Sequence, residues 1–137
     1  MWANRFRTRF DDHFQQGAGP KSPGDITFLE DWVIDMCSWY GHLHVTIEGW
    51  RQLELHDPQI DELLTSPNVE QLRRLRNAVW HYQKDWVDNR ILAFMQQPDV
   101  VIWVRGLNQH LGRFFLTWHQ KRGLGESPGE ADGVTVQ

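Results

Sequence analysis

An apolar stripe with helical spacing runs through residues 25–53 and constrains the fold more than any other feature of the chain. Its members recur every three or four positions, which is the period of one face of an α-helix. Thr27 and Glu30 match a capping box at its start. We therefore expect one long helix here, with a bend near Gly41 or Gly49. The stripe consists of Phe28, Trp32, Met36, Tyr40, Leu43, Ile47, Trp50 and Leu53.

Shorter parts of the chain show the same spacing. Residues 2–14 predict a first helix, which glycines and prolines interrupt from position 17 onward. The pairs Asp57-Pro58 and Ser66-Pro67 each match an N-cap followed by proline at the first helical position. They predict a short helix that ends near Thr65 and a further helix directly after it. The aromatic stripe of the first helix is Trp2, Phe6, Phe10 and Phe14, and the apolar stripe of the helix after Pro67 is Val69, Leu72, Leu75, Val79 and Tyr82.

A last long helix is expected from Pro98 onward. Residues 100–104 would suit a strand by propensity alone, but the stripe that continues after them favours a helix. Residues 83–97 fit no clear pattern, except for a short helix expected around residues 91–95. The stripe of the last helix is Val101, Val104, Leu107, Leu111, Phe114, Phe115 and Trp118.

These elements predict an all-α fold, an up-and-down helical bundle of four main helices plus one or two short helices. At 137 residues the chain is expected to form a single domain over residues 1–122, followed by a disordered acidic tail over 123–137. Eight Trp and seven Phe supply large core side chains. The lone Cys37 excludes an intrachain disulfide and a cysteine-based zinc site. We see no secretory segment and no membrane span, so a cytoplasmic location away from membranes is expected.

Residues 76–81 contain the one sequence pattern that suggests chemistry. Arg76 is followed at once by Asn77, and His81 comes five positions after the arginine. Six Arg–His pairs in the chain have four to six residues between them, but only Arg76 is followed directly by Asn, Asp or His. A fixed cation that holds phosphate and an imidazole that titrates near neutral pH suit RNA cleavage without a metal. The net charge of −4 counts against tight nonspecific nucleic-acid binding, although residues 64–125 are basic.

On an ideal helix Arg76 and His81 point roughly 140° apart, whereas Asn77 and His81 share a face. Trp80, Arg73 and Lys84 project between these directions if the helix continues that far. The core stripe lies on the other side of the helix. This polar arc can accept a phosphate and stack a base, or it can simply be the solvent side of an amphipathic helix.

The Arg-Asn-x-x-x-His pattern on the later part of a small helical bundle resembles the HEPN superfamily. The surrounding residues 72–81, together with Trp103, Val104, Arg105, Phe114 and Phe115, are similar to members of that superfamily. The resemblance implies a dimer whose two motifs face each other across the subunit interface. It also implies a metal-independent endoribonuclease in a toxin–antitoxin or other defence system, or an inactive scaffold. One toxin branch has Tyr two residues after the histidine, where this chain has Gln83, with Tyr82 directly after His81.

The resemblance assigns roles to individual residues. His81 would act as general base or acid, Arg76 would stabilise charge on the scissile phosphate, and Asn77 would orient either His81 or a phosphate oxygen. No metal and no cofactor is expected. The expected partners are a second copy of the chain, RNA, and an antitoxin or other regulatory protein. The residues expected to bind substrate are Arg73, Trp80, Lys84 and Arg105.

Other interpretations of the sequence stay open beside this one. The leading alternative is a catalytically inactive bundle of the same fold that serves dimerisation or partner binding. His42 and His44 lie about 200° apart on a helix and would chelate a metal poorly. The acidic residues between Asp57 and Glu62 suit the start of a helix better than a calcium loop. A small-molecule pocket lined by tryptophans is a further interpretation, but the sequence shows no cluster of polar residues that would support it.

Overall fold

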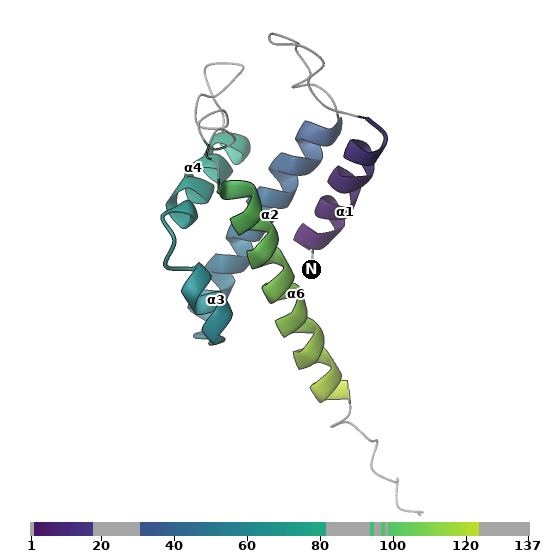
Figure 1. Cartoon of the computed structure of the whole chain (residues 1–137). Helices are drawn as coiled ribbons and strands as arrows, with labels where there is room; N and C mark the ends of the chain where they lie inside the picture. Colours follow the sequence, from purple (N-terminus) through teal and green to yellow (C-terminus); the bar gives the residue numbers. More distant parts are fainter. Residues whose placement is uncertain (1, 18–30, 82–93, 95–96, 98, 124–137) are drawn as a thin grey trace, which may run out of the picture.

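The computed structural model describes residues 2–17, 31–81, 94, 97 and 99–123. These residues form helices and contain no strand, which confirms the all-α prediction. In Figure 1 the four long helices run alternately up and down, and the C-terminal half of the last one extends beyond the others. The elements are α1 (Trp2–Gln15), α2 (Asp31–Gln52), α3 (Pro58–Leu63), α4 (Asn68–Trp80) and α6 (Val100–Gly123).

Helix α2 lies at the centre of the fold, since it packs against both α1 and α4. The predicted stripe is buried from Trp32 to Trp50, but Leu53 at its end is 69% exposed, which corrects the prediction there. Trp39 lies outside the predicted stripe and is nonetheless fully buried. A central helix is surrounded by neighbours, so its buried surface is wider than the single face that a surface helix would show. Phe28 and the predicted capping box lie outside the described residues.

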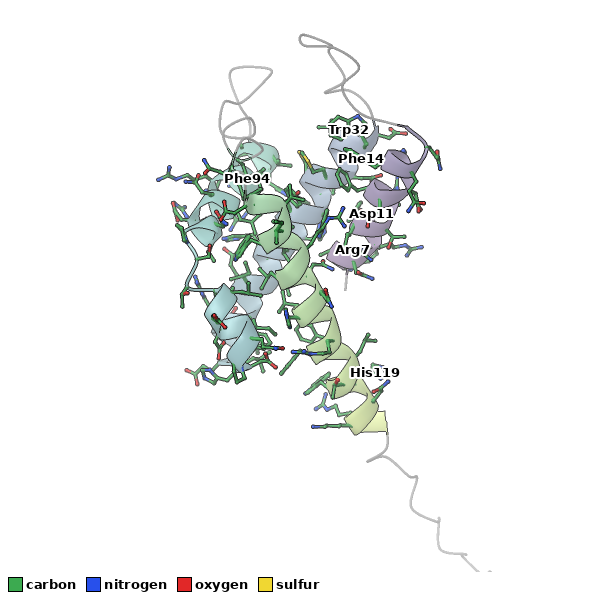
Figure 2. All side chains as sticks on the ribbon, viewed as in Figure 1. Arg7, Asp11, Phe14, Trp32, Phe94 and His119 are labelled. Carbon is green, nitrogen blue, oxygen red and sulfur yellow. The ribbon has the colours of Figure 1, made fainter. Side chains whose placement is uncertain are left out.

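Helix α1 covers one side of α2 with only part of its predicted stripe. Phe10 is buried against the rings of Trp32 and Trp39, and Phe6 is partly buried. Trp2, by contrast, is 67% exposed. Phe14 is half exposed and meets Trp32 edge-on where α1 and α2 adjoin (Figure 2). The predicted first helix is confirmed, but Trp2 and Phe14 at the two ends of its aromatic stripe are not core residues.

The predicted N-cap is confirmed for α3, whereas α4 begins one residue later than predicted, with Pro67 and not Ser66 as its N-cap. The Asp57 carboxylate accepts the backbone N–H groups of Gln59 and Ile60, as expected of an N-cap. Ser66 Oγ accepts the N–H of Asn68 at 3.2 Å, at the first residue of α4. Val69, Leu72, Leu75 and Ala78 then form the buried side of α4, while Val79 is only half-buried.

Helix α6 completes the core. Residues 100–104 are helical, so the alternative of a strand is wrong there. Leu107 and Leu111 are fully buried, whereas Trp118 at the protruding end is 47% exposed. Trp103 Nε1 donates to the Leu63 carbonyl at 2.9 Å and ties α6 to α3.

Several predictions from sequence fall outside the described residues. These are the short helix around residues 91–95, except for Phe94, and the tail over 123–137, except for Gly123 at the end of α6. Phe94 is buried and packs edge-on against Tyr40. Among the described helices, none is long and apolar enough to cross a membrane.

Candidate functional site

The Arg-Asn-x-x-x-His motif lies at the C-terminal end of α4. The helix ends at Trp80, and His81 is its C-cap with an extended backbone (φ −113°, ψ 147°). The His81 N–H still donates to the Asn77 carbonyl at 3.2 Å, and the His81 side chain is exposed. The expected 140° separation assumed a helix that continues past His81, and that assumption is wrong. The direction of the imidazole is set by the cap, not by helical rotation.

Arg76 is held against α2 by an ion pair. Its Nη2 atom lies 2.5 Å from Glu48 Oε1, and the side chain remains 24% exposed. The Nε atom of Arg76 is buried and has no hydrogen-bond partner among the described residues. One edge of the guanidinium is therefore fixed, while part of the side chain still reaches solvent. Neither Arg76 nor His81 is enclosed in apolar packing.

A buried histidine lies beside this ion pair. His44 is 4% exposed, and its Nδ1 atom is 3.7 Å from Glu48 Oε1. Burial lowers the pKa of His44 below 6.5, and the positive charges of Arg76, Arg73 and Arg51 lower it further, against an opposing effect of Glu48. At neutral pH the structure therefore holds a neutral imidazole next to the Arg76–Glu48 pair.

We expect this histidine to make the protein less stable in mild acid. The pKa of His44 is lower in the folded than in the unfolded chain, so the unfolded chain binds the proton more tightly. The stabilising contribution is complete above pH 6.5 and is lost as pH falls toward the lower folded pKa. Urea unfolding at pH 7 and pH 5 should show a larger loss of unfolding free energy in the wild type than in His44→Gln. Equal losses in the two proteins would contradict the assignment.

Trp80 packs its indole over Gly41 of α2, in a close approach that only glycine permits. A Cβ atom added to Gly41 would lie 3.2 Å from Trp80 Cε2 and closer still to Nε1. The ring is nevertheless 55% exposed. The His42 ring meets it edge-on at a centroid distance of 5.4 Å and stacks on Phe6 from the other side, at 5.1 Å. The end of α4 thus carries an exposed aromatic surface next to the motif.

Of the other predicted substrate residues, the two that the structure describes contact partners outside the motif. Arg73 makes two hydrogen bonds to Glu70 on its own helix, at 2.7 and 2.8 Å. Together with the neighbouring Arg74 these bonds lower the pKa of Glu70 to about 2. Arg105 on α6 contacts Asp11 of α1, not α4. Lys84 lies outside the described residues. The sequence therefore predicted one cluster where the structure has a smaller site and a separate basic region.

Two residues that lie beside the motif were not identified from the sequence. Glu48 and His44 lie four positions apart on α2, so they share the face that meets α4. A carboxylate and an imidazole directly beside Leu43 and Ile47 of the apolar stripe are the signal that could have indicated a polar contact there. The partner on α4 could not be named, because no periodicity within one helix specifies which residue of another it meets.

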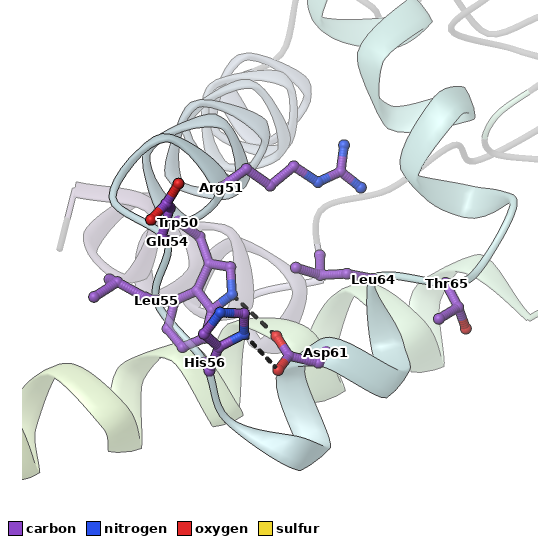
Figure 3. Close-up of a pocket in the computed structure, with 8 residues that line it drawn as sticks. All are labelled: Trp50, Arg51, Glu54, Leu55, His56, Asp61, Leu64 and Thr65. Carbon is purple, nitrogen blue, oxygen red and sulfur yellow. Dashed lines mark hydrogen bonds and ion pairs between the residues drawn. The ribbon is translucent and has the colours of Figure 1, made fainter.

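A concavity with a volume of about 470 Å³ lies between the end of α2 and α3, away from the motif (Figure 3). There Asp61 accepts from Trp50 Nε1 at 3.2 Å and lies 3.4 Å from His56 Nδ1. The hydroxyl of Thr65, also in its lining, donates to the backbone carbonyl of Glu62. None of the described residues that line it belongs to the motif.

Other candidate chemistry is limited within the described residues. These residues contain no group of three His, Cys, Asp or Glu side chains placed to hold a metal ion. Burial raises the pKa of the Cys37 thiol to about 11, so the thiolate is scarce at neutral pH. No protein-family model, no curated protein and no solved structure matches this chain. The function is therefore inferred from the chain's own residues.

Proposed function

We propose that this protein is a metal-independent endoribonuclease of the HEPN type. One observation carries the proposal: Arg76 and His81 belong to the same end of α4, with the guanidinium fixed by Glu48 yet partly exposed and the imidazole exposed at the cap. A preset cation and an accessible base are the two groups that cleavage by a 2′-hydroxyl needs. Trp80 adds an exposed ring on which a base can stack.

In the proposed reaction His81 accepts the proton of the RNA 2′-hydroxyl, whose oxygen attacks the adjacent phosphorus. The bond from phosphorus to the 5′ oxygen breaks, and that oxygen takes up a proton from the protonated imidazole or from water as it leaves. The products are a 2′,3′-cyclic phosphate and a 5′-hydroxyl. Arg76 stabilises the negative charge on the phosphate oxygens, and Asn77 orients His81 or one of those oxygens.

The Arg76–Glu48 pair is compatible with this role. A guanidinium has five N–H donors, and the contact with Glu48 is made through Nη2. A phosphate can therefore bind another edge of the group while Glu48 keeps it in place. In this proposal Glu48 is a positioning residue, because it acts on the phosphate only through Arg76.

Chelation tests the metal-independent mechanism. We expect the purified protein to cleave single-stranded RNA at an undiminished rate in excess EDTA. The new ends should be 2′,3′-cyclic phosphate and 5′-hydroxyl, as detected by their resistance or susceptibility to end-labelling enzymes. Loss of cleavage on chelation that added Mg²⁺ restores would refute the mechanism.

A methyl group at Gly41 should displace the Trp80 ring and weaken cleavage. The added Cβ of Gly41→Ala meets the indole, whereas Gly49 on the same helix has nothing within 4 Å of an added Cβ. Alanine favours a helix over glycine by about 1 kcal/mol, so neither change should unfold α2. We expect kcat/KM to fall on the order of 10-fold in Gly41→Ala, since stacking of one base contributes roughly 1–3 kcal/mol. Gly49→Ala should match the wild type; equal rates in both variants would exclude Trp80 from substrate binding.

The proposal includes a homodimer in the cytoplasm, with the two motifs facing each other, and regulation by an antitoxin or similar protein in a defence system. Sedimentation equilibrium at micromolar concentration tests the dimer. The second candidate is a catalytically inactive bundle that binds a partner. It is favoured by the Arg76–Glu48 contact, which offsets the charge of the arginine without any substrate.

A further inference from the structure

A basic groove separate from the motif lies between α1 and the C-terminal half of α6. It has a volume of about 880 Å³, and the described residues that line it include three arginines and no acidic residue. Figure 2 shows Arg7 on α1 and His119 on the protruding end of α6, the two elements that form it. This lining contrasts with the net charge of −4 over the whole chain. The lining includes Arg7, Arg105, Arg113, Asn108, Gly112 and Phe115.

Two of these arginines are held in place by a polar network. Asp11 lies 2.7 Å from Arg7 Nη1 and 2.6 Å from Arg105 Nη2, and so bridges them. Arg105 also lies over the Trp39 ring at 5.5 Å. Asn4 accepts from Arg7 Nε at 3.2 Å. The two guanidinium groups are therefore ordered before any ligand arrives, which reduces the entropy lost on binding.

The floor of the groove is a buried amide. Asn108 is 3% exposed, accepts from Trp39 Nε1 at 3.1 Å and donates to Asn4 Oδ1 at 3.3 Å. This chain of bonds joins α1, α2 and α6 beneath the arginines. The groove is thus a built feature of the core and not a chance gathering of surface side chains.

The charge of the groove exceeds what the protein itself neutralises. Asp11 offsets one of the two charges of Arg7 and Arg105. Arg113 is half exposed and has only a distant partner among the described residues, Asp57, at 3.7 Å. Positive charge therefore remains available, and arginine forks match phosphate oxygens better than lysine does.

We propose that this groove binds the phosphodiester backbone of single-stranded RNA, on a stretch of the strand away from the cleaved bond. The choice of RNA rests on the proposed nuclease function. Phe115, half-buried in the lining, supplies a ring for a base, and the volume suits a nucleotide. Arg7 adjoins Phe6, which stacks on His42 next to Trp80. Helix α1 thus lies between the groove and the motif end, and the strand can pass along it.

Two glycines of α6 allow a matched test. A Cβ added at Gly112, which lines the groove, or at Gly106, which does not, meets nothing within 4 Å. Gly112→Glu places a carboxylate in the groove, Gly112→Gln places a neutral group of the same size there, and Gly106→Glu adds the same charge elsewhere on the helix. The probe is a fluorescent 2′-O-methyl RNA, which cannot be cleaved through a 2′-hydroxyl. Binding is followed by anisotropy at several salt concentrations, with circular dichroism as the control for folding.

We expect Gly112→Glu to weaken RNA binding about five-fold at roughly 0.1 M salt. The slope of log binding constant against log salt concentration should fall in magnitude by about 0.7, which corresponds to the loss of one phosphate contact on a single strand. Arg113→Gln should have the same effect, and Arg113→Lys should recover most of the affinity. Gly112→Gln and Gly106→Glu should bind nearly as the wild type does. Equal affinities for Gly112→Glu and Gly106→Glu, or equally tight binding of poly-glutamate to the wild type, would overturn the proposal.

The groove and the nuclease function can fail separately. If the wild type never cleaves RNA but its RNA binding depends on Gly112 and Arg113, the proposal of a binding groove is supported and the proposed nuclease function is refuted. Cleavage that depends on His81, with binding indifferent to changes at Gly112 and Arg113, would support the nuclease and refute the groove.

Discussion

Replacing His81 by alanine should reduce RNA cleavage by about 10²–10⁴-fold, the usual contribution of a general acid or base. The side chain is exposed at the C-cap of α4, so its removal opens no cavity in the core. We therefore expect an unchanged far-UV spectrum and an unchanged urea midpoint. The rate should be measured as kcat/KM on a defined single-stranded RNA.

Arg76→Ala should reduce cleavage by about 10²–10³-fold, as loss of one group that stabilises transition-state charge does. It also leaves Glu48 without its cation, so a modest loss of stability is expected. Arg76→Lys keeps the charge without the planar fork, and should recover only part of the rate.

His56→Ala is the matched control for these variants. His56 is an exposed histidine that lies beside a carboxylate, that of Asp61. It lines the separate concavity near α3, away from the motif. The His56→Ala variant should cleave RNA at the rate of the wild type. Cleavage that survives in His81→Ala would refute the proposed chemistry. If His81→Ala and Arg76→Ala both lose cleavage only because they unfold, the result would favour the hypothesis of a catalytically inactive bundle.

The largest loss of stability is expected from Trp39→Ala, at about 3–5 kcal/mol. Trp39 has no exposed surface and packs against Phe10 at a ring distance of 5.7 Å. Its removal leaves a cavity among α1, α2 and α6. It also leaves the buried amide of Asn108 without the indole N–H that it accepts, a further cost.

Trp118→Ala provides the control for the loss of an indole. Trp118 is 47% exposed on the protruding end of α6, where it contacts Arg122. Its removal should change the unfolding free energy by less than about 1 kcal/mol, because surface changes rarely exceed that. Urea unfolding followed by circular dichroism measures both variants. Similar losses for Trp39→Ala and Trp118→Ala would mean that Trp39 is not a core anchor.

Local features of the sequence predicted the helices well. The Asp57 cap and the helical state of residues 100–104 agree with the structure, and α4 begins one residue after its predicted start. Each depends on neighbours within one turn, either through side-chain capping or through the period of apolar residues. The end of α4 at Trp80 was missed, because no glycine or proline marks it in the sequence.

The composition of the candidate site was predicted only in part. Arg76 and Asn77 lie in the last turns of α4 and His81 is its C-cap, so their grouping at one end of that helix was accessible from the sequence. The contact of Arg76 with Glu48 and the approach of Trp80 to Gly41 were not. Both depend on how α4 is rotated and placed against α2.

The sequence by itself determined the helical class, most helix starts and the order of the motif residues, because these follow from contacts between residues a few positions apart. Only the tertiary structure decided that Trp39 is core while Trp2 is exposed, and that Arg105 faces α1 and not the motif. The physical reason is that helix packing selects one rotation of each helix from several that bury similar area. Charged partners such as Asp11 and Arg105, 94 positions apart, meet only once that rotation is set.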